Sequence, residues 1–346
     1  MRIPNPPMPK KRTNIYGIVV FILVIIFSIV GFYLGHTTSK VNNTKNNIYD
    51  TSLHTKQDNF NGKKPFNILL LGTDTGALGR TEKRGNSDTI IIVSVNPKTK
   101  STQFLSIPRD TMSEMIGTDK FKVQKINAAY NLGGASMSLA TVHNLLNVPI
   151  KYYIVMNMGG LTKMVNSVGG VTVTPDLTFT YDHHTFIKGK KMHLNGDEAL
   201  AYARMRYDDP RGDYGRQARQ RQIIIALLKH SLSMSTLRHL DTLLDSVSDN
   251  VRTNLTFNSM LNIGKNYRKC LDNTSSDYLH GVSANIYNSS YQVMSDQELQ
   301  RTSDIARRAI NLKPEKIENN ETYQNSKNNF DWNSTDPNQN YHIFEP

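Results

Sequence analysis

The sequence predicts an α/β protein: a mixed central β-sheet flanked by helices on both faces, preceded by one transmembrane helix. Three observations predict this architecture. Continuous apolar runs of strand length occur at 66–72 and 89–95, as in strands buried on both faces. Segments with helical spacing and capping residues alternate with further strand-like segments. A stretch of 21 residues without a charge, 15–35, lies near the N-terminus.

The uncharged stretch at 15–35 is long enough for a membrane span, because a bilayer core of about 30 Å needs about 20 helical residues. A cleaved signal peptide is the alternative, but its apolar region normally has about 7–15 residues and a small-residue cleavage site follows it. The basic residues 10–12 precede the stretch. The positive-inside rule therefore predicts a cytoplasmic tail at 1–14 and an extracellular remainder. The expected location is the cell membrane, as a single-pass protein of a Gram-positive-type envelope.

Composition limits the partners. Lys and Arg number 41 against 29 Asp and Glu, which gives a net charge of +12. Outside a membrane this charge favours phosphate-bearing polymers or the lipid bilayer as partners, and no nucleic acid is expected. The single cysteine, Cys270, excludes an intramolecular disulfide framework, a Cys-rich zinc module and a thiol redox pair.

Two polar segments flank the predicted domain at 66–312. Residues 36–65 are rich in Asn, Thr and Lys, and they predict a polar extracellular tether. Residues 313–346 contain many Asn, Asp and Ser with little apolar periodicity, and they predict a disordered tail. The role of 233–312 stays open, although apolar stretches there indicate a C-terminal part of the same domain.

The first three strands follow directly from the sequence. Strand 66–72 opens the domain and strand 89–95 follows it. A turn at 96–100, with Asn and Pro, leads to a third strand at 103–107. The second and third strands are therefore expected to form a hairpin.

Helical segments follow in the second half of the domain. Ser136 is expected to cap a helix through about Leu146, and Asn195 another through Ala203. The intervening segments, in order, read as a strand at 152–156, a helix at 161–167, a glycine stop at 169–170 and a strand at 171–173. A final helix at 213–228 carries an apolar face.

Charged residues flank these strands. Asp74 follows the first strand, Asp88 precedes the second, and Arg109 with Asp110 follows the third. If neighbouring strands are antiparallel, these residues share one sheet edge, where α/β sheets place ligand sites. One or two carboxylates with substrate phosphate oxygens are a typical Mg²⁺ site. The alternative is that each aspartate only caps a turn.

A second charged cluster lies at 204–220. Arg216, Arg219 and Gln220 have the spacing of one helix face, and Asp213 can cap that helix and orient an arginine. The planar guanidinium forms two hydrogen bonds with phosphate and keeps its charge. The cluster predicts a polyanion site, with a solvated basic face as the alternative. P-loop, Gly-x-Ser-x-Gly and His-Glu-x-x-His motifs are absent from the sequence.

Six segments together resemble the LytR-CpsA-Psr family in order and spacing over about residues 66–232. They are NILLLGTD at 67–74, SDT at 87–89, SIPRDT at 106–111, KINAAY at 125–130 with Gly133-Gly134, VGGV at 168–171, and the block 204–220. The resemblance implies a membrane-anchored phosphotransferase that moves a wall glycopolymer, such as a teichoic acid or a capsular polysaccharide. The polymer would pass from a polyprenyl-pyrophosphate carrier to peptidoglycan with Mg²⁺ or Mn²⁺.

The same resemblance assigns site residues. Asp74 and Asp88 match the metal-binding carboxylates of the family. The groups that match its pyrophosphate-binding residues, with Asp213 in support, are Arg109, Arg204, Arg206, Arg216 and Gln220. Arg219, on the same predicted helix face, is a further candidate.

One position departs from the family pattern. Asn86 stands where relatives often have arginine, and Arg84 is the candidate replacement. Asp74 or Asp110 is the candidate general base.

Alternatives remain at this stage. Ile90, Ile92 and Leu105 are candidates for a lipid channel, although plain core is the commoner role. A hydrolase of lipid-linked glycans is the second possible function, because the same charged groups would serve it. A non-enzymatic regulator of envelope genes, of the transcriptional attenuator type, is the third function, although 14 cytoplasmic residues are few for a folded domain.

Overall fold

The computed structural model describes residues 56–76, 84–230 and 249–345. The predicted membrane span at 15–35 and most of the predicted tether lie outside these residues. Within the described ranges, no helix combines the length and the apolar character needed to span a bilayer.

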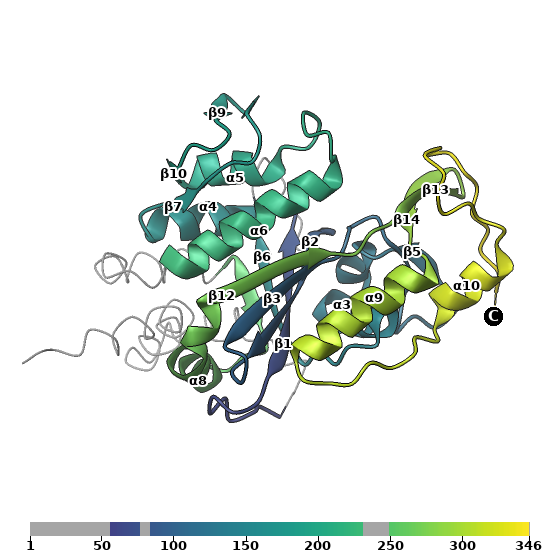
Figure 1. The fold of residues 1–346 in the computed structure, drawn as a ribbon, viewed down its shortest axis with the longest axis horizontal. Coiled ribbons are helices and arrows are strands. Elements are labelled where there is room, and N and C mark those ends of the chain that lie inside the picture. Colours follow the sequence, from purple (N-terminus) through teal and green to yellow (C-terminus); the bar gives the residue numbers. More distant parts are fainter. Residues whose placement is uncertain (1–55, 77–83, 231–248, 346) are drawn as a thin grey trace, which may run out of the picture.

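A six-stranded mixed sheet forms the centre of the domain, in the order β11-β6-β1-β2-β3-β12 (Figure 1). β1 pairs antiparallel with β2, and β2 pairs antiparallel with β3, so the predicted hairpin is present. β6 and β12 are parallel to their neighbours β1 and β3. The strands are β1 Phe66–Thr73, β2 Ser87–Asn96, β3 Ser101–Ser106, β6 Tyr152–Asn157, β11 Val251–Thr253 and β12 Asn273–Tyr278.

Helices cover both faces of the sheet, as predicted. On one face α3 (Ala128–Leu146) and α9 (Asp296–Ala309) pack on a core that includes Ile90, Ile92 and Leu105. These three residues are therefore plain core, the commoner of the two roles considered from the sequence, and they do not form a lipid channel. The opposite face is covered by α6 (Asp213–His230), α8 (Phe257–Tyr267) and the short 3₁₀ helix η3 (Arg268–Leu271).

A further layer packs beside α6 as a separate cluster, visible in Figure 1 as α4, α5 and the short strands above α6. Asn195 caps α5 as predicted, because its side chain accepts from Glu198 N at 2.9 Å while Glu198 Oε2 accepts from Asn195 N at 2.8 Å. The elements are α4 Met158–Ser167, α5 Gly196–Arg204, β7 Val171–Val173, β8 Phe179–Tyr181, β9 His184–Phe186 and β10 Met192–Leu194.

The helix predicted from Ser136 begins earlier, at Ala128, and is kinked at Gly134. Gly134 has a φ of 66°, which glycine adopts at little cost. The capping residue that the sequence indicates therefore marks the second half of α3, beyond the kink.

The C-terminal segment is ordered, so the prediction of a disordered tail is wrong. Tyr341 N donates to Asn285 O at 3.0 Å, and Asn285 N donates to Gln339 O at 2.7 Å, which adds the tail to a hairpin. Phe330 and Tyr341 are buried against that hairpin. The few apolar residues are too widely spaced to show periodicity, yet Phe330, Trp332 and Tyr341 pack together on the hairpin. The elements are β4 Met112–Glu114, β5 Val123–Lys125, the hairpin β13 Val282–Ile286 with β14 Ser289–Val293, and α10 Asn320–Lys327.

The domain also begins before residue 66. Phe60 is 3% exposed and packs on Phe66, Tyr152 and Tyr267. The described end of the predicted tether, 56–65, is therefore part of the folded domain.

Cys270 lies in η3 and is 2% exposed. Its Sγ donates to Asn96 O at 3.4 Å. Burial raises the pKa of the thiol to about 11.

The buried carboxylate of Glu321 in α10 indicates that the stability of the protein depends on pH. Its Oε1 accepts from Glu114 N at 3.0 Å, whereas the buried Oε2 has no partner. Burial raises the pKa of Glu321 to about 7. Between the ordinary value of 4.5 and about 7 the folded state binds more protons than the unfolded state, so the free energy of unfolding should fall as pH rises. Glu321→Gln should flatten this dependence in urea unfolding at pH 5 and pH 8; an unchanged slope would contradict it.

Candidate active site

A β-bulge places Asp88 at the end of β2. Thr73 pairs with Ser87 and Gly72 pairs with Thr89, so Asp88 is the extra residue between two regular pairs. Bulges redirect side chains and are frequent at functional sites. Asp74 follows β1 at the same edge, where its N donates to Asn86 O at 3.3 Å. The structure therefore brings Asp74 and Asp88 to neighbouring strand ends.

Arg109 joins this edge from the end of β3. Its Nη1 lies 3.0 Å from Asp88 Oδ1, and its Nε lies 3.6 Å from Asp110 Oδ2. Burial lowers the pKa of Arg109, but the charge and hydrogen bond of Asp88 and the charges of Asp110 and Asp213 outweigh burial and raise it. Lys125 Nζ lies 3.3 Å from Asp110 Oδ1. Arg109 thus stays charged between two carboxylates.

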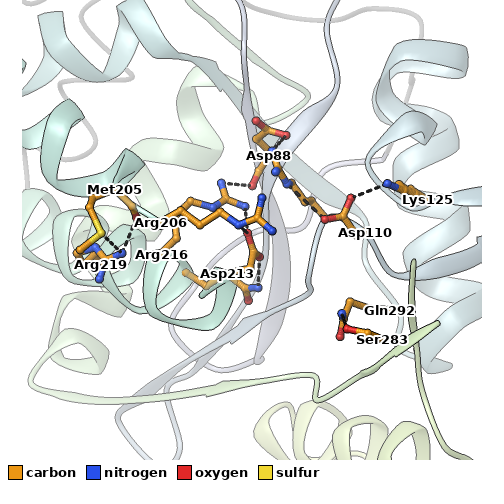
Figure 2. A network of polar contacts seen from close by, with 12 residues as sticks. Asp88, Asp110, Lys125, Met205, Arg206, Asp213, Arg216, Arg219, Ser283 and Gln292 are labelled. Carbon is orange, nitrogen blue, oxygen red and sulfur yellow. Dashed lines mark hydrogen bonds and ion pairs between the residues drawn. The ribbon is translucent and has the colours of Figure 1, made fainter. Parts of the chain in front are cut away.

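The first turn of α6 supplies the next group (Figure 2). Arg216 donates from Nε and Nη2 to Asp213 Oδ1 at 3.0 and 2.7 Å, and from Nη1 to Asp88 O at 3.1 Å. Gln217 Nε2 donates to Asp213 Oδ2 at 2.8 Å. Burial raises the pKa of Asp213, but Arg216 and Gln217 outweigh it and lower the pKa. Arg206 Nε lies 4.0 Å from Asp213 Oδ1. Asp213 therefore orients the arginines, as the sequence predicts.

Arg219 does not belong to this group, and its predicted role in binding pyrophosphate is wrong. Its side chain is fully buried, pairs with Asp209, and donates from Nε to Tyr202 O at 3.2 Å and from Nη2 to Met205 O. The prediction used the spacing of Arg216, Arg219 and Gln220 along α6. That spacing does not reveal that α5 covers the part of α6 that carries Arg219. Arg219 instead stabilises the end of α5, where Arg204 is the last helical residue and Arg206 follows two residues later.

Asp209 is a residue that the sequence analysis missed. Its carboxylate accepts from Arg211 N and Nε, at 2.9 and 3.0 Å, in addition to its pair with Arg219. Burial raises the pKa of Asp209, but the hydrogen bonds from Arg211 and Arg219 lower it to about 2. The available signal was an aspartate before Pro210 inside an arginine-rich block, which is typical of a structured turn.

Arg84 is exposed and points toward α3. Its Cζ would lie 3.8 Å from a β-carbon on Gly134, at the kink. This places Arg84 beside the kink of α3.

A cavity of about 440 Å³ opens beside the charged residues, a size common for small-molecule sites. Its floor is formed by β1 and β6, and its walls by α4, α5 and α6. Leu70, Ile154, Leu200 and Ile224 are among its apolar lining residues. Its charged and amide-bearing lining side chains, which we call the mouth, include Asp88, Arg109, Arg204, Arg206, Arg216 and Gln220. The cavity therefore joins an apolar chamber to a cationic mouth.

Asp74 and Asp88, at neighbouring strand ends, are the candidate ligands for a divalent cation. A β-carbon at Gly85 would lie 2.2 Å from Asp74 Oδ1, so glycine leaves the room that this carboxylate occupies. Among the described residues no group of three or more His, Cys, Asp or Glu side chains could hold a metal ion. A cation here would therefore have two carboxylates, with its other ligands from substrate or water, as is usual for Mg²⁺.

The chain belongs to the LytR_cpsA_psr family, whose model matches residues 31–308. It is similar to the polyisoprenyl-teichoic acid–peptidoglycan teichoic acid transferase TagU of Enterococcus faecalis, with 40% identity over 306 residues, which are 88% of this chain and all of the relative. It is 46% identical over 257 residues to the TagU of Bacillus anthracis, with 72% and 82% of the two chains covered. On these relationships the protein is an enzyme of the transferase type found in this family.

Solved structures agree with this assignment. The crystal structure of Bacillus subtilis TagU has a TM-score of 0.58 and 36% identity, with 72% of this chain and 99% of that chain covered. A structure of TagT bound to LIIa-WTA has a TM-score of 0.60 and 26% identity, with 76% and 97% covered. The mixed sheet and its helices thus match known folds of the family.

Proposed function

We propose that this protein transfers a wall glycopolymer, most closely a teichoic acid, from a polyprenyl-pyrophosphate carrier to peptidoglycan. The observation that carries the proposal is the cationic mouth on the apolar cavity. A lipid pyrophosphate has the same two parts, an apolar chain and a compact anion. The names of the TagU relatives support teichoic acid as the polymer and peptidoglycan as the acceptor.

The arginines of the mouth bind and neutralise the pyrophosphate. Arg109, Arg206 and Arg216 are already oriented by carboxylates, so little ordering is needed when phosphate arrives. Arg204 and Gln220 complete the mouth. Phosphoryl transfer depends mainly on positioning and on neutralising charge that moves to the leaving group.

The reaction exchanges one P–O bond for another. A muramic acid hydroxyl oxygen attacks the phosphorus that carries the glycan, and a new phosphodiester bond forms. The bond from this phosphorus to the bridging oxygen breaks, and polyprenyl phosphate leaves with the electron pair. The hydroxyl proton passes to a carboxylate, for which Asp74 and Asp110 are the candidates.

Asp74 and Asp88 are the residues that would hold Mg²⁺ or Mn²⁺. The ion would supply further neutralisation of the phosphate oxygens. The predicted span at 15–35 would hold the enzyme at the membrane, where its lipid-linked donor is found.

The test is a transfer reaction with the full chain, a lipid-linked teichoic acid precursor and peptidoglycan oligomers, with Mg²⁺ or with a chelator. A phosphodiester between polymer and peptidoglycan, detected by mass spectrometry only with the metal, is the expected result. Release of free polymer without joining would favour the hydrolase. Donor binding without turnover would favour the regulator.

Filling the apolar cavity should weaken donor binding. Ile224 lines the cavity and is only partly buried. Ile224→Trp should raise the KM for a lipid-linked donor about tenfold. The indole fills the space that the lipid chain would occupy, and such overpacking costs about 1–3 kcal/mol. Ile187→Trp is the matched control, since Ile187 is 42% exposed and does not line the cavity. Equal KM values in both variants would contradict an apolar lipid site here.

A further inference from the structure

Aromatic rings gather beside the first turn of α6, directly after Asp213. The Tyr214 and Tyr278 rings lie 4.7 Å apart, centroid to centroid, and Tyr278 and His280 lie 4.0 Å apart with planes at 30°. His280 is exposed, whereas Tyr214 and Tyr278 are partly buried. Stacked rings with an exposed outer member offer a flat apolar face to solvent.

Hydrogen bonds connect these rings to Asp110 at the charged edge of the sheet. Tyr214 Oη lies 3.3 Å from Gln292 Oε1, and Gln292 Nε2 donates to Ser283 Oγ at 2.9 Å. The backbone of Gln292 donates to Asp110 O at 2.9 Å. Asp110, Gln292 and Ser283 are each partly exposed.

Lys125 and Tyr291 extend the same surface. Lys125 pairs with Asp110 and lies 5.4 Å over the Tyr291 ring. We call the set of Asp110, Lys125, Tyr278, His280, Ser283, Tyr291 and Gln292 the β14 surface.

The part of the β14 surface around Asp110 lies on the opposite side of Asp88 from Arg206, which lines the donor cavity. Figure 2 shows Asp110 and Lys125 on one side of Asp88 and Arg206 with Arg219 on the other, while Gln292 and Ser283 lie near Asp110. None of the residues of the β14 surface lines the cavity. In a transfer reaction the acceptor must approach the phosphorus from the side that the leaving lipid phosphate does not occupy.

We propose that the β14 surface binds the glycan strand of the acceptor, an inference that rests on the proposed function. A sugar ring has an apolar face of C–H groups and a rim of hydroxyl and amide groups. The exposed ring of His280 fits that face, and Asp110, Ser283 and Gln292 supply acceptors and donors for the rim. The sugar then lies beside Asp110, which is a candidate base for its hydroxyl.

The experiment measures binding of soluble, uncross-linked peptidoglycan glycan strands to the full chain in detergent, by isothermal titration calorimetry without donor. His280→Ala should weaken binding roughly 3- to 10-fold, the range for one aromatic contact. His280→Phe keeps a flat ring and should retain the affinity. Tyr287→Ala is the control, because Tyr287 is 78% exposed at the turn of the β13–β14 hairpin and lies outside the β14 surface.

Steady-state transfer kinetics then distinguish the proposed glycan-binding surface from the proposed transferase function. The His280→Ala variant should show a raised KM for the acceptor, with kcat and the donor KM unchanged. Equal glycan affinity in wild type and His280→Ala, or no glycan binding by the wild type, would overturn the inference. A raised KM for the donor instead would assign the surface to the donor glycan and would also overturn it. Strand binding that depends on His280, in a protein that never joins polymer to peptidoglycan, would refute the transferase and leave the glycan site standing.

Discussion

Replacing Arg109 with alanine should lower the kcat of glycopolymer transfer by roughly 100- to 1,000-fold, the usual effect of removing one fixed group that stabilises transition-state charge. Arg109 lies between Asp88 and Asp110, and its charge is held by both. Without it, Asp88 loses its cationic partner at 3.0 Å, and the pyrophosphate loses a guanidinium at the same edge. The measurement is the steady-state rate of transfer with saturating donor and acceptor.

Two further variants make this prediction specific. Arg109→Lys keeps the charge but loses the planar fork, so its activity should lie between wild type and Arg109→Ala. Arg308→Ala removes an arginine that is 56% exposed on α9, and it should leave transfer unchanged. Transfer by Arg109→Ala within threefold of wild type, in a protein with an unaltered circular dichroism spectrum, would show that Arg109 has no catalytic role.

Asp209→Asn should lower the free energy of unfolding by about 3–5 kcal/mol, the usual cost of leaving one member of a buried ion pair alone. The side chains of Asp209 and Arg219 are both fully buried. Because the pKa of Asp209 is lowered to about 2, the stability that it contributes is present above the ordinary value of 3.8 and is lost as pH falls through about 2. Urea unfolding between pH 2 and pH 6 measures both effects.

The same variant should also weaken donor binding. Arg219 holds the backbone carbonyl of Met205, the residue between Arg204 and Arg206. Loosening that carbonyl should raise the donor KM more than it lowers kcat. Asp304→Asn is the control, because its partner Arg308 on α9 is 56% exposed and ion pairs open to solvent contribute about 1 kcal/mol or less. If Asp209→Asn and Asp304→Asn lower the free energy of unfolding equally, the buried Asp209–Arg219 pair stabilises the protein no more than the solvent-accessible pair.

Most of the sheet and the position of the charged edge can be predicted from local sequence patterns. The apolar runs of β1 and β2 and the Asn-Pro turn before β3 are unambiguous, and antiparallel pairing then brings Asp74, Asp88 and Arg109 to one edge. The bulge at Asp88 has no such pattern, because it depends on how β1 and β2 come into register. The sequence thus predicts where a strand ends, but it does not predict the direction in which a side chain at that end points.

The remaining parts of the site depend on packing between distant segments. By their spacing, Arg216 and Arg219 are expected on one face of α6. Only the docking of α5 buries Arg219 and gives it a structural role. The apolar cavity requires α4, α5 and α6 over β1 and β6, which no single segment encodes. The C-terminal tail is ordered by isolated contacts such as Tyr341 with the β13–β14 hairpin. Its polar composition alone gives no sign of them.

The burial of Cys270 makes this protein well suited to thiol labelling. The reactive form of cysteine is the thiolate, and a raised pKa in a buried position keeps Cys270 as an unreactive thiol at neutral pH. A maleimide dye or spin label should therefore leave the native protein unmodified. A single cysteine introduced by Tyr287→Cys, at the exposed turn of the β13–β14 hairpin, would then carry the only label. Fluorescence or electron paramagnetic resonance could follow occupancy of the neighbouring β14 surface in real time without first removing the native cysteine.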